Sequence, residues 1–138
     1  MANRNYVSGG KIFSMHVSPV FLDCTVQIGA AGAVSSFTGS TIKSVVLVST
    51  GIYKINLMDN FSGLYAAMGS MQSPASGLSG VSTVEVQNAP NASVSVLATP
   101  SLTVKCLAPA GTVVAPASGS ALNVLIFLSN SSIKIQGE

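Results

Sequence analysis

Alternating apolar residues on both sides of a Thr-Gly pair restrict the fold of this chain more than any other feature. Positions 42–58 read IKSVVLVSTGIYKINLM, and the second half alternates Tyr53, Ile55 and Leu57 with Lys54 and Asn56. A two-residue period is typical of a half-buried strand. Glycine in a two-residue loop tolerates the positive φ of the primed hairpin turns. The segment therefore predicts an antiparallel hairpin with strands at 42–49 and 52–58.

Similar short apolar segments recur about every ten residues, without a clear long helical pattern between them. Further strands are expected at 11–18, 24–29, 81–89, 92–98, 101–108, 121–129 and 132–136. The pattern predicts an all-β protein, an antiparallel, jelly-roll-like β-sandwich of about eight short strands. We expect residues 11–138 to form this single domain. Residues 1–10 are polar and end in Gly9-Gly10, and we expect them to form a short extended N-terminal arm.

The remaining segments carry weaker signals. Pro19 is expected to end the first strand, residues 30–40 to form a loop with Phe37 buried, and residues 64–71 to form a short helix or an edge strand. Residues 121–129 are apolar on both faces, which is typical of a central strand in a two-layer core. The residues expected between the two sheets are Val45, Leu47, Ile55, Leu57, Val84, Val104, Val124 and Ile126.

The chain is almost without charge. Only 7% of its residues are charged and its net charge is +2, whereas 48% are hydrophobic. No apolar run approaches the ~20 residues that span a bilayer, so we expect no membrane insertion. The basic residues are scattered rather than clustered, which argues against nucleic acid as a partner. Serine and threonine could replace charge on an ordinary surface, but we favour the interpretation that partners cover much of this one.

Residues that could support catalysis or bind a metal are sparse. His16 is the single histidine, and the acids are Asp23, Asp59, Glu85 and Glu138. Neither a catalytic constellation nor a short-spaced pair of metal ligands can be assembled from them. We therefore expect no enzyme activity, no cofactor and no metal. Cys24 and Cys106 each share a face with apolar neighbours and are expected to be buried and reduced.

Aromatic residues and the N-terminus add two expectations. Tryptophan is absent and no aromatic platform for sugars or bases is evident, so Tyr53 is expected to pack across the hairpin. The first ten residues lack the apolar centre of a signal peptide, and synthesis in a cytoplasm is therefore expected.

The hairpin also carries a resemblance to a known family. The residues Thr50-Gly51-Ile52-Tyr53-Lys54-Ile55-Asn56-Leu57-Met58-Asp59-Asn60-Phe61, followed by Leu64, resemble a stretch found in small β-sandwich head decoration or cementing proteins of tailed bacteriophages. The proline- and glycine-rich segment 109–120 and the apolar strand 122–131 are similar as well. The resemblance covers less than half of the chain and transfers no functional residue.

The resemblance implies a non-enzymatic structural virion protein, made in the host cytoplasm and bound as an oligomer to the capsid exterior. Its partners would be the major capsid protein and further copies of itself, as a homodimer or, alternatively, a homotrimer. Within the arm and just after it, Arg4, Tyr6 and Lys11 are the candidate capsid contacts. A receptor-binding knob of a phage tail or head fibre is the alternative function. Such a knob should show an exposed aromatic cluster, and we expect none in this chain.

Overall fold

The computed structural model describes residues 19–59, 63–87 and 101–129. Within these ranges the chain forms eight strands and one short 3-10 helix. Their bounds are β1 Pro19–Ile28, η1 Ala30–Gly32, β2 Val34–Thr38, β3 Ile42–Ser49, β4 Ile52–Leu57, β5 Gly63–Gln72, β6 Thr83–Val86, β7 Ser101–Leu107 and β8 Ala121–Ser129. The arm, with Arg4 and Tyr6, lies outside the described residues, as do Lys11, His16 and the strands expected at 11–18, 92–98 and 132–136.

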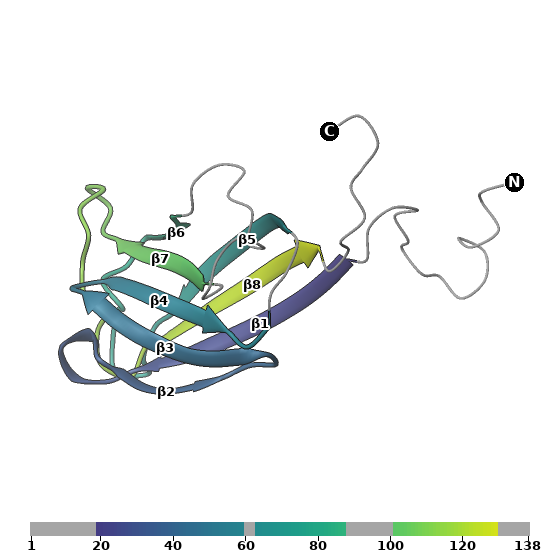
Figure 1. The fold of residues 1–138 in the computed structure, drawn as a ribbon. Coiled ribbons are helices and arrows are strands. Elements are labelled where there is room, and N and C mark those ends of the chain that lie inside the picture. The colour runs from purple at the N-terminus through teal and green to yellow at the C-terminus, as the bar shows by residue number, and fades with distance from the viewer. Residues whose placement is uncertain (1–18, 60–62, 88–100, 130–138) are drawn as a thin grey trace, which may run out of the picture.

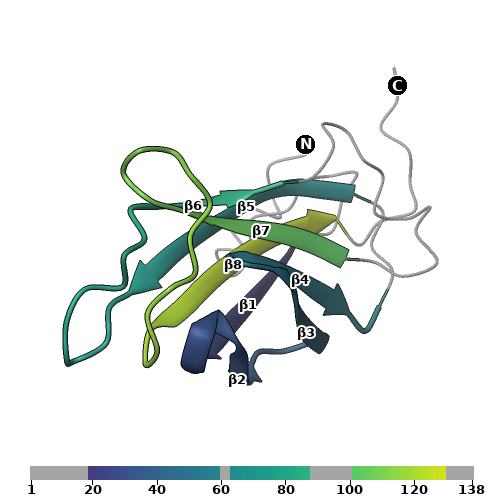
Figure 2. The same ribbon diagram turned by 90° about the vertical axis from the view of Figure 1, so that its left-hand side faces the viewer.

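The strands form two antiparallel sheets that pack face to face (Figures 1 and 2). Sheet A has the order β2-β1-β8-β5, and sheet B has the order β3-β4-β7-β6. In sheet A, β1 pairs with β8 along its length. The ladder runs from Pro19, opposite Ser129, to Gln27, opposite Ala121. The expected all-β sandwich of about eight strands is therefore confirmed.

A single apolar core lies between the sheets. Sheet A contributes the inward residues of β1 and β8, among them Cys24, Val26, Leu122 and Ile126, all almost fully buried. Of the eight core residues expected from the sequence, six are buried and the other two, Leu47 and Val84, are partly buried. Burial of aliphatic side chains contributes roughly 1.5–3 kcal/mol each, so this layer is the main source of stability.

The β3–β4 hairpin forms where the alternation placed it. Leu47 pairs with Tyr53 and Ser49 with Ile52, which leaves Thr50-Gly51 as the connection. Gly51 has a φ of 69°, and a side chain there would collide with the carbonyl oxygen of Val114. The sequence suggested a primed turn, which needs a positive φ at the first loop residue. Thr50 is not among the residues with positive φ, so the turn is of another type.

Three local expectations were wrong. Pro19 was expected to end a strand but belongs to β1, where it stands opposite Ser129. Residues 34–38 form the edge strand β2, where the loop was expected, because they pair with β1 from Thr25 to Ile28. Phe37 lies on this edge and is exposed rather than buried. Of the two alternatives for residues 64–71, the edge strand is correct.

Tyr53 ties sheet B to the segment after β1. Its side chain is completely buried, and its hydroxyl donates a hydrogen bond of 2.6 Å to the carbonyl oxygen of Gly32 in η1. Burial raises the pKa of Tyr53 well above its usual range, so the hydroxyl keeps its proton and remains a donor. The tyrosine thus packs in the core and also satisfies a backbone group.

The Tyr53→Phe variant should lose about 1–3 kcal/mol of unfolding free energy, because the Gly32 carbonyl would remain buried without its donor. Ser82 offers a matched control, since its hydroxyl donates to the Leu107 carbonyl at 3.1 Å in an exposed position. Ser82→Ala should change stability by less than about 0.5 kcal/mol. Urea denaturation of both variants measures the difference, and equal losses would contradict this role of Tyr53.

Candidate functional site

The most distinctive surface of the described chain is the outer face of sheet A. We use this name for the solvent-facing side chains of its three long strands. In β1 these alternate with the core residues Leu22, Cys24 and Val26, and in β8 with Leu122, Val124 and Ile126. The outer face consists of Phe21, Asp23, Thr25, Gln27, Ala66, Met68, Ser70, Gln72, Asn123, Leu125 and Phe127.

Apolar side chains form a continuous stripe on this face. Phe21 pairs with Phe127 across the β1–β8 ladder, and their rings stack with centroids 4.5 Å apart and an interplanar angle of 14°. Leu125 is the next outward residue of β8, and it pairs with Met68 of β5. Phe21 is 62% exposed, Leu125 45% and Met68 66%. An exposed contiguous apolar patch is typical of a surface that binds another molecule.

The Phe21–Phe127 pair corrects the expectation that no exposed aromatic cluster exists. The two residues come from opposite ends of the chain, and only the β1–β8 register brings them together. Their positions within alternating strands were visible in the sequence, but the partner strand was not. The long β1–β8 pairing is therefore the signal that sequence reasoning missed.

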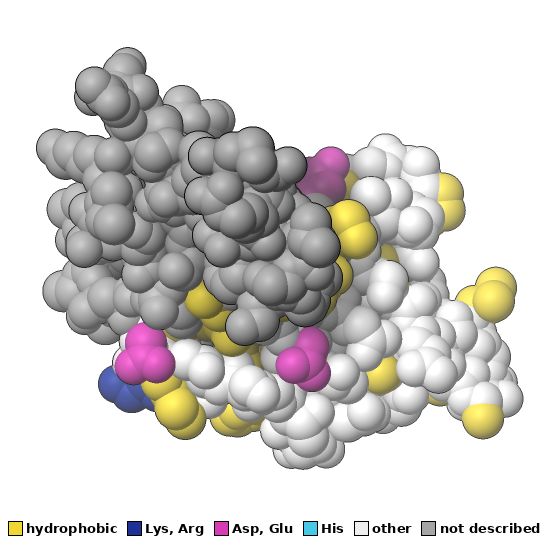
Figure 3. Space-filling model, turned by 90° about the vertical axis from the view of Figure 1, so that its right-hand side faces the viewer, with side chains coloured by type: hydrophobic (Ala, Val, Ile, Leu, Met, Phe, Trp, Pro, Cys, Tyr) yellow, Lys and Arg dark blue, Asp and Glu magenta, His cyan; other side chains and the backbone are white. Residues whose placement is uncertain are grey.

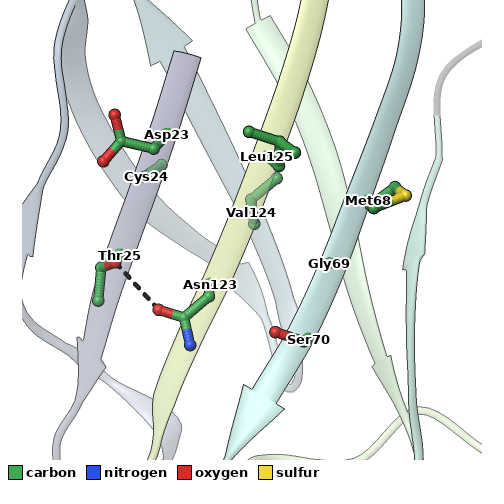
Figure 4. Close-up of a pocket in the computed structure, with 9 residues that line it drawn as sticks. All are labelled: Asp23, Cys24, Thr25, Met68, Gly69, Ser70, Asn123, Val124 and Leu125. Carbon is green, nitrogen blue, oxygen red and sulfur yellow. Dashed lines mark hydrogen bonds between the residues drawn. The ribbon is translucent and has the colours of Figure 1, made fainter. Parts of the chain in front are cut away.

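Polar groups adjoin the stripe around a shallow hollow of about 260 Å³. Figure 4 shows how Asp23, Thr25, Asn123 and Ser70 stand around it, on the three strands β1, β8 and β5. The hydroxyl of Thr25 donates a hydrogen bond of 3.0 Å to the side-chain oxygen of Asn123. Met68 and Leu125 complete the exposed lining. The hollow therefore offers neutral hydrogen-bonding groups and one carboxylate beside apolar side chains.

The outer face of sheet B has a different character. Here Lys54 and Lys105 point outward, and Glu85 stands opposite Lys105 in the β6–β7 register. Val46 and Val48 are exposed too, but they lie on the edge strand β3, and Val46 stands opposite Lys54. Among the described charged side chains, Asp23 alone belongs to the outer face of sheet A. The two faces are thus chemically distinct.

The three acids that the structure describes are not brought together. Asp23 lies on β1, Asp59 follows β4, and Glu85 lies on β6 of the other sheet. In the part of the chain that the structure describes, no group of three or more His, Cys, Asp or Glu residues could hold a metal ion. These positions supply no support for an enzyme or metal site.

The arm precedes a well-defined end of sheet A. Pro19, the first described residue, pairs with Ser129, and Ser129 also pairs with Gly63. Figure 3 looks at this end of the molecule and shows few charged side chains, one acidic group beside a basic one, among hydrophobic and uncharged polar side chains. Arg4, Tyr6 and Lys11 all lie before Pro19, so the structure brings none of the three capsid-contact candidates into a described site.

Comparisons with protein-family models, with curated proteins and with solved structures find no match. Among the described residues, no helix has the length and apolar character needed to cross a membrane.

Both cysteines are free and buried, as expected. Cys24 is placed beneath the hollow but points into the core, where it is 1% exposed. Burial raises the pKa of the Cys24 thiol from 9.0 to about 11, and the charge of Asp23 acts in the same direction. Burial alone raises the pKa of Cys106 from 9.0 to about 11.

The native thiols should therefore react slowly with a thiol reagent even at pH 10. The thiolate is the reactive form, and a raised pKa keeps each thiol protonated until the pH approaches about 11. A Val46→Cys variant provides an exposed thiol as an internal control and should react at once. Colorimetric titration of the native and the urea-unfolded protein measures both rates. Rapid labelling of Cys24 and Cys106 without unfolding would contradict the assignment.

Proposed function

We propose that this protein is a non-enzymatic structural component of a virus particle. It binds the outside of a tailed-phage capsid as an oligomer and cements neighbouring capsomers. The observation that carries the proposal is the exposed apolar stripe of Phe21, Phe127, Leu125 and Met68, because such a surface suits a chain that works while bound to others. The low charge of the chain and its hairpin resemblance to shell-decorating proteins support the same function.

The mechanism is stabilisation by mass action. A protein that binds assembled capsomers and not separated ones shifts the equilibrium towards the shell. At a free concentration 100 times its dissociation constant, each bound copy contributes about 2.7 kcal/mol. An oligomer adds avidity, because the second contact becomes intramolecular once the first has formed. A β-sandwich supplies a rigid body for this purpose, and no chemical step is required.

The arm is the proposed capsid contact. Arg4 can donate charge-assisted hydrogen bonds and Tyr6 can bury an aromatic ring, which are the side-chain types that dominate interface energies. Lys11 adds a second cation nearby.

The purified protein should bind empty phage shells stoichiometrically and raise the temperature at which they disassemble. Deleting residues 2–8 should leave the sandwich folded and weaken shell binding about 10- to 100-fold, the effect of losing one or two anchor side chains. Co-sedimentation with shells measures binding, and circular dichroism verifies the fold. Lys54→Ala, on the outer face of sheet B, is the control and should bind like the unaltered protein.

Two outcomes would contradict the proposal. A folded, full-length protein that binds no shell would reject the cementing function. A truncated protein that protects shells as well as the intact one would retain that function but remove the arm from it.

A fibre knob that binds a receptor or a glycan is the second candidate. The stacked Phe21–Phe127 pair beside Asp23 and Asn123 favours it, because sugars bind where an exposed aromatic side chain adjoins carboxylate and amide groups. The fibre knob would be favoured over the first candidate if the chain binds a glycan but no shell. The Phe21→Ala variant should then lose the glycan binding.

A further inference from the structure

We propose that two copies of this chain associate through the outer face of sheet A, face to face about a two-fold axis. The inference deepens the proposed function, on which it rests for its biological setting, by naming the surface that forms the oligomer. The occupant of the face is a second copy of the same chain. Three properties of the described residues support this choice over other occupants.

The first property is the separation of apolar and charged side chains. Phe21, Leu125 and Met68 stand in one stripe, whereas Lys54, Lys105 and Glu85 gather on the outer face of sheet B. If the outer faces of both sheets were meant to face water, both would be expected to carry polar and charged side chains. Covering the stripe removes three exposed apolar side chains from water, and the lysines and the glutamate of sheet B stay solvated.

The second property is self-complementarity. In a two-fold interface the same patch meets itself, so each group must find its partner within that patch. Thr25, Ser70 and Asn123 suit this arrangement, because hydroxyl and amide groups both donate and accept hydrogen bonds. The Asp23 carboxylate, the single charged group of the face, can accept from these donors on the second copy. A face rich in one charge would repel its own copy.

The third property is shape and size. The hollow of about 260 Å³ can receive one bulky side chain, such as the exposed ring of a second Phe21. Three strands of nine or ten residues give a face about 30 Å long and about 15 Å wide. Two such faces would cover about 900 Å² of projected area, which lies at the small end of interface sizes and fits a weak, concentration-dependent dimer.

The sandwich geometry accommodates the contact without rearrangement. Sheets stack about 10 Å apart when their side chains interdigitate, with strands aligned within about 30°. The outer residues of β1 and β8 are set by the same ladder as the buried ones, so the face is rigid before association. Preorganisation lowers the entropic cost of binding. The dimer would therefore contain four stacked sheets, with sheet B of each copy outermost.

Sedimentation velocity of the full chain, from submicromolar to high micromolar concentration, tests the inference. We expect a monomer–dimer equilibrium. The double variant F21S/L125S should weaken dimerisation about 100-fold or more, because each substitution acts twice in a two-fold interface. The matched control is V46S/V48S, which removes side chains that are 49% and 59% exposed from the outer face of sheet B, against 62% and 45% for Phe21 and Leu125. The control should dimerise like the unaltered chain.

Each other outcome overturns the inference. A chain that stays monomeric at all concentrations places no second copy on this face, and a trimer contradicts the two-fold arrangement. Equal weakening by both double variants, or by the control alone, assigns the contact elsewhere. Met68→Ser provides an independent single variant of the same stripe, and circular dichroism verifies that every variant is folded.

Shell binding, measured on the same samples, separates this inference from the proposed function. A dimer that depends on Phe21 and Leu125 but binds no shell would reject the cementing function and retain the interface. A monomer that binds shells would reject the interface and retain shell binding, but without the oligomer.

Discussion

The ladder between β1 and β8 is the interaction on which the rest of the structure depends. It joins residues 19–27 to residues 121–129 in one uninterrupted antiparallel register. On one side it places Leu22, Cys24 and Val26 against the core residues of β8, and on the other it stacks Phe21 on Phe127. Because side chains alternate strictly along a strand, a shift of one residue would exchange the two sides. The same register therefore fixes the core and the candidate binding face.

The sequence predicted those parts of the fold that depend on local pattern. The β3–β4 hairpin, β7 and the burial of both cysteines follow from alternation and turn residues alone. The parts it mispredicted depend on a partner strand. β2 contains two serines and follows a glycine-rich stretch, so only its pairing with β1 makes it a strand. The alanines and methionine of β5 suit a helix equally well, and pairing with β8 decides the outcome.

The candidate binding face was hidden in the sequence for a related reason. Residues 121–129 are apolar on both faces, a pattern that predicts burial on both sides. In the structure β8 is central within sheet A, but only Leu122, Val124, Ile126 and Leu128 point into the core. Periodicity identifies two apolar faces and cannot tell which of them the chain covers itself. The uncovered face, with Leu125 and Phe127, is consistent with the low charge of the chain, and the proposed association with neighbours rests on these two observations.

The central claim is that the outer face of sheet A is covered when copies associate, and methionine oxidation tests it most directly. Met68 on this face is 66% exposed, and Met58, just after β4, is 63% exposed. Dilute peroxide converts exposed methionine to its sulfoxide, and peptide mass spectrometry follows both residues in one sample. The account predicts that Met68 oxidises several-fold more slowly at concentrations where the chain associates, whereas Met58 keeps its rate. If Met68 and Met58 oxidise at the same rates in the dilute and the associated protein, the face is not covered and the account is wrong.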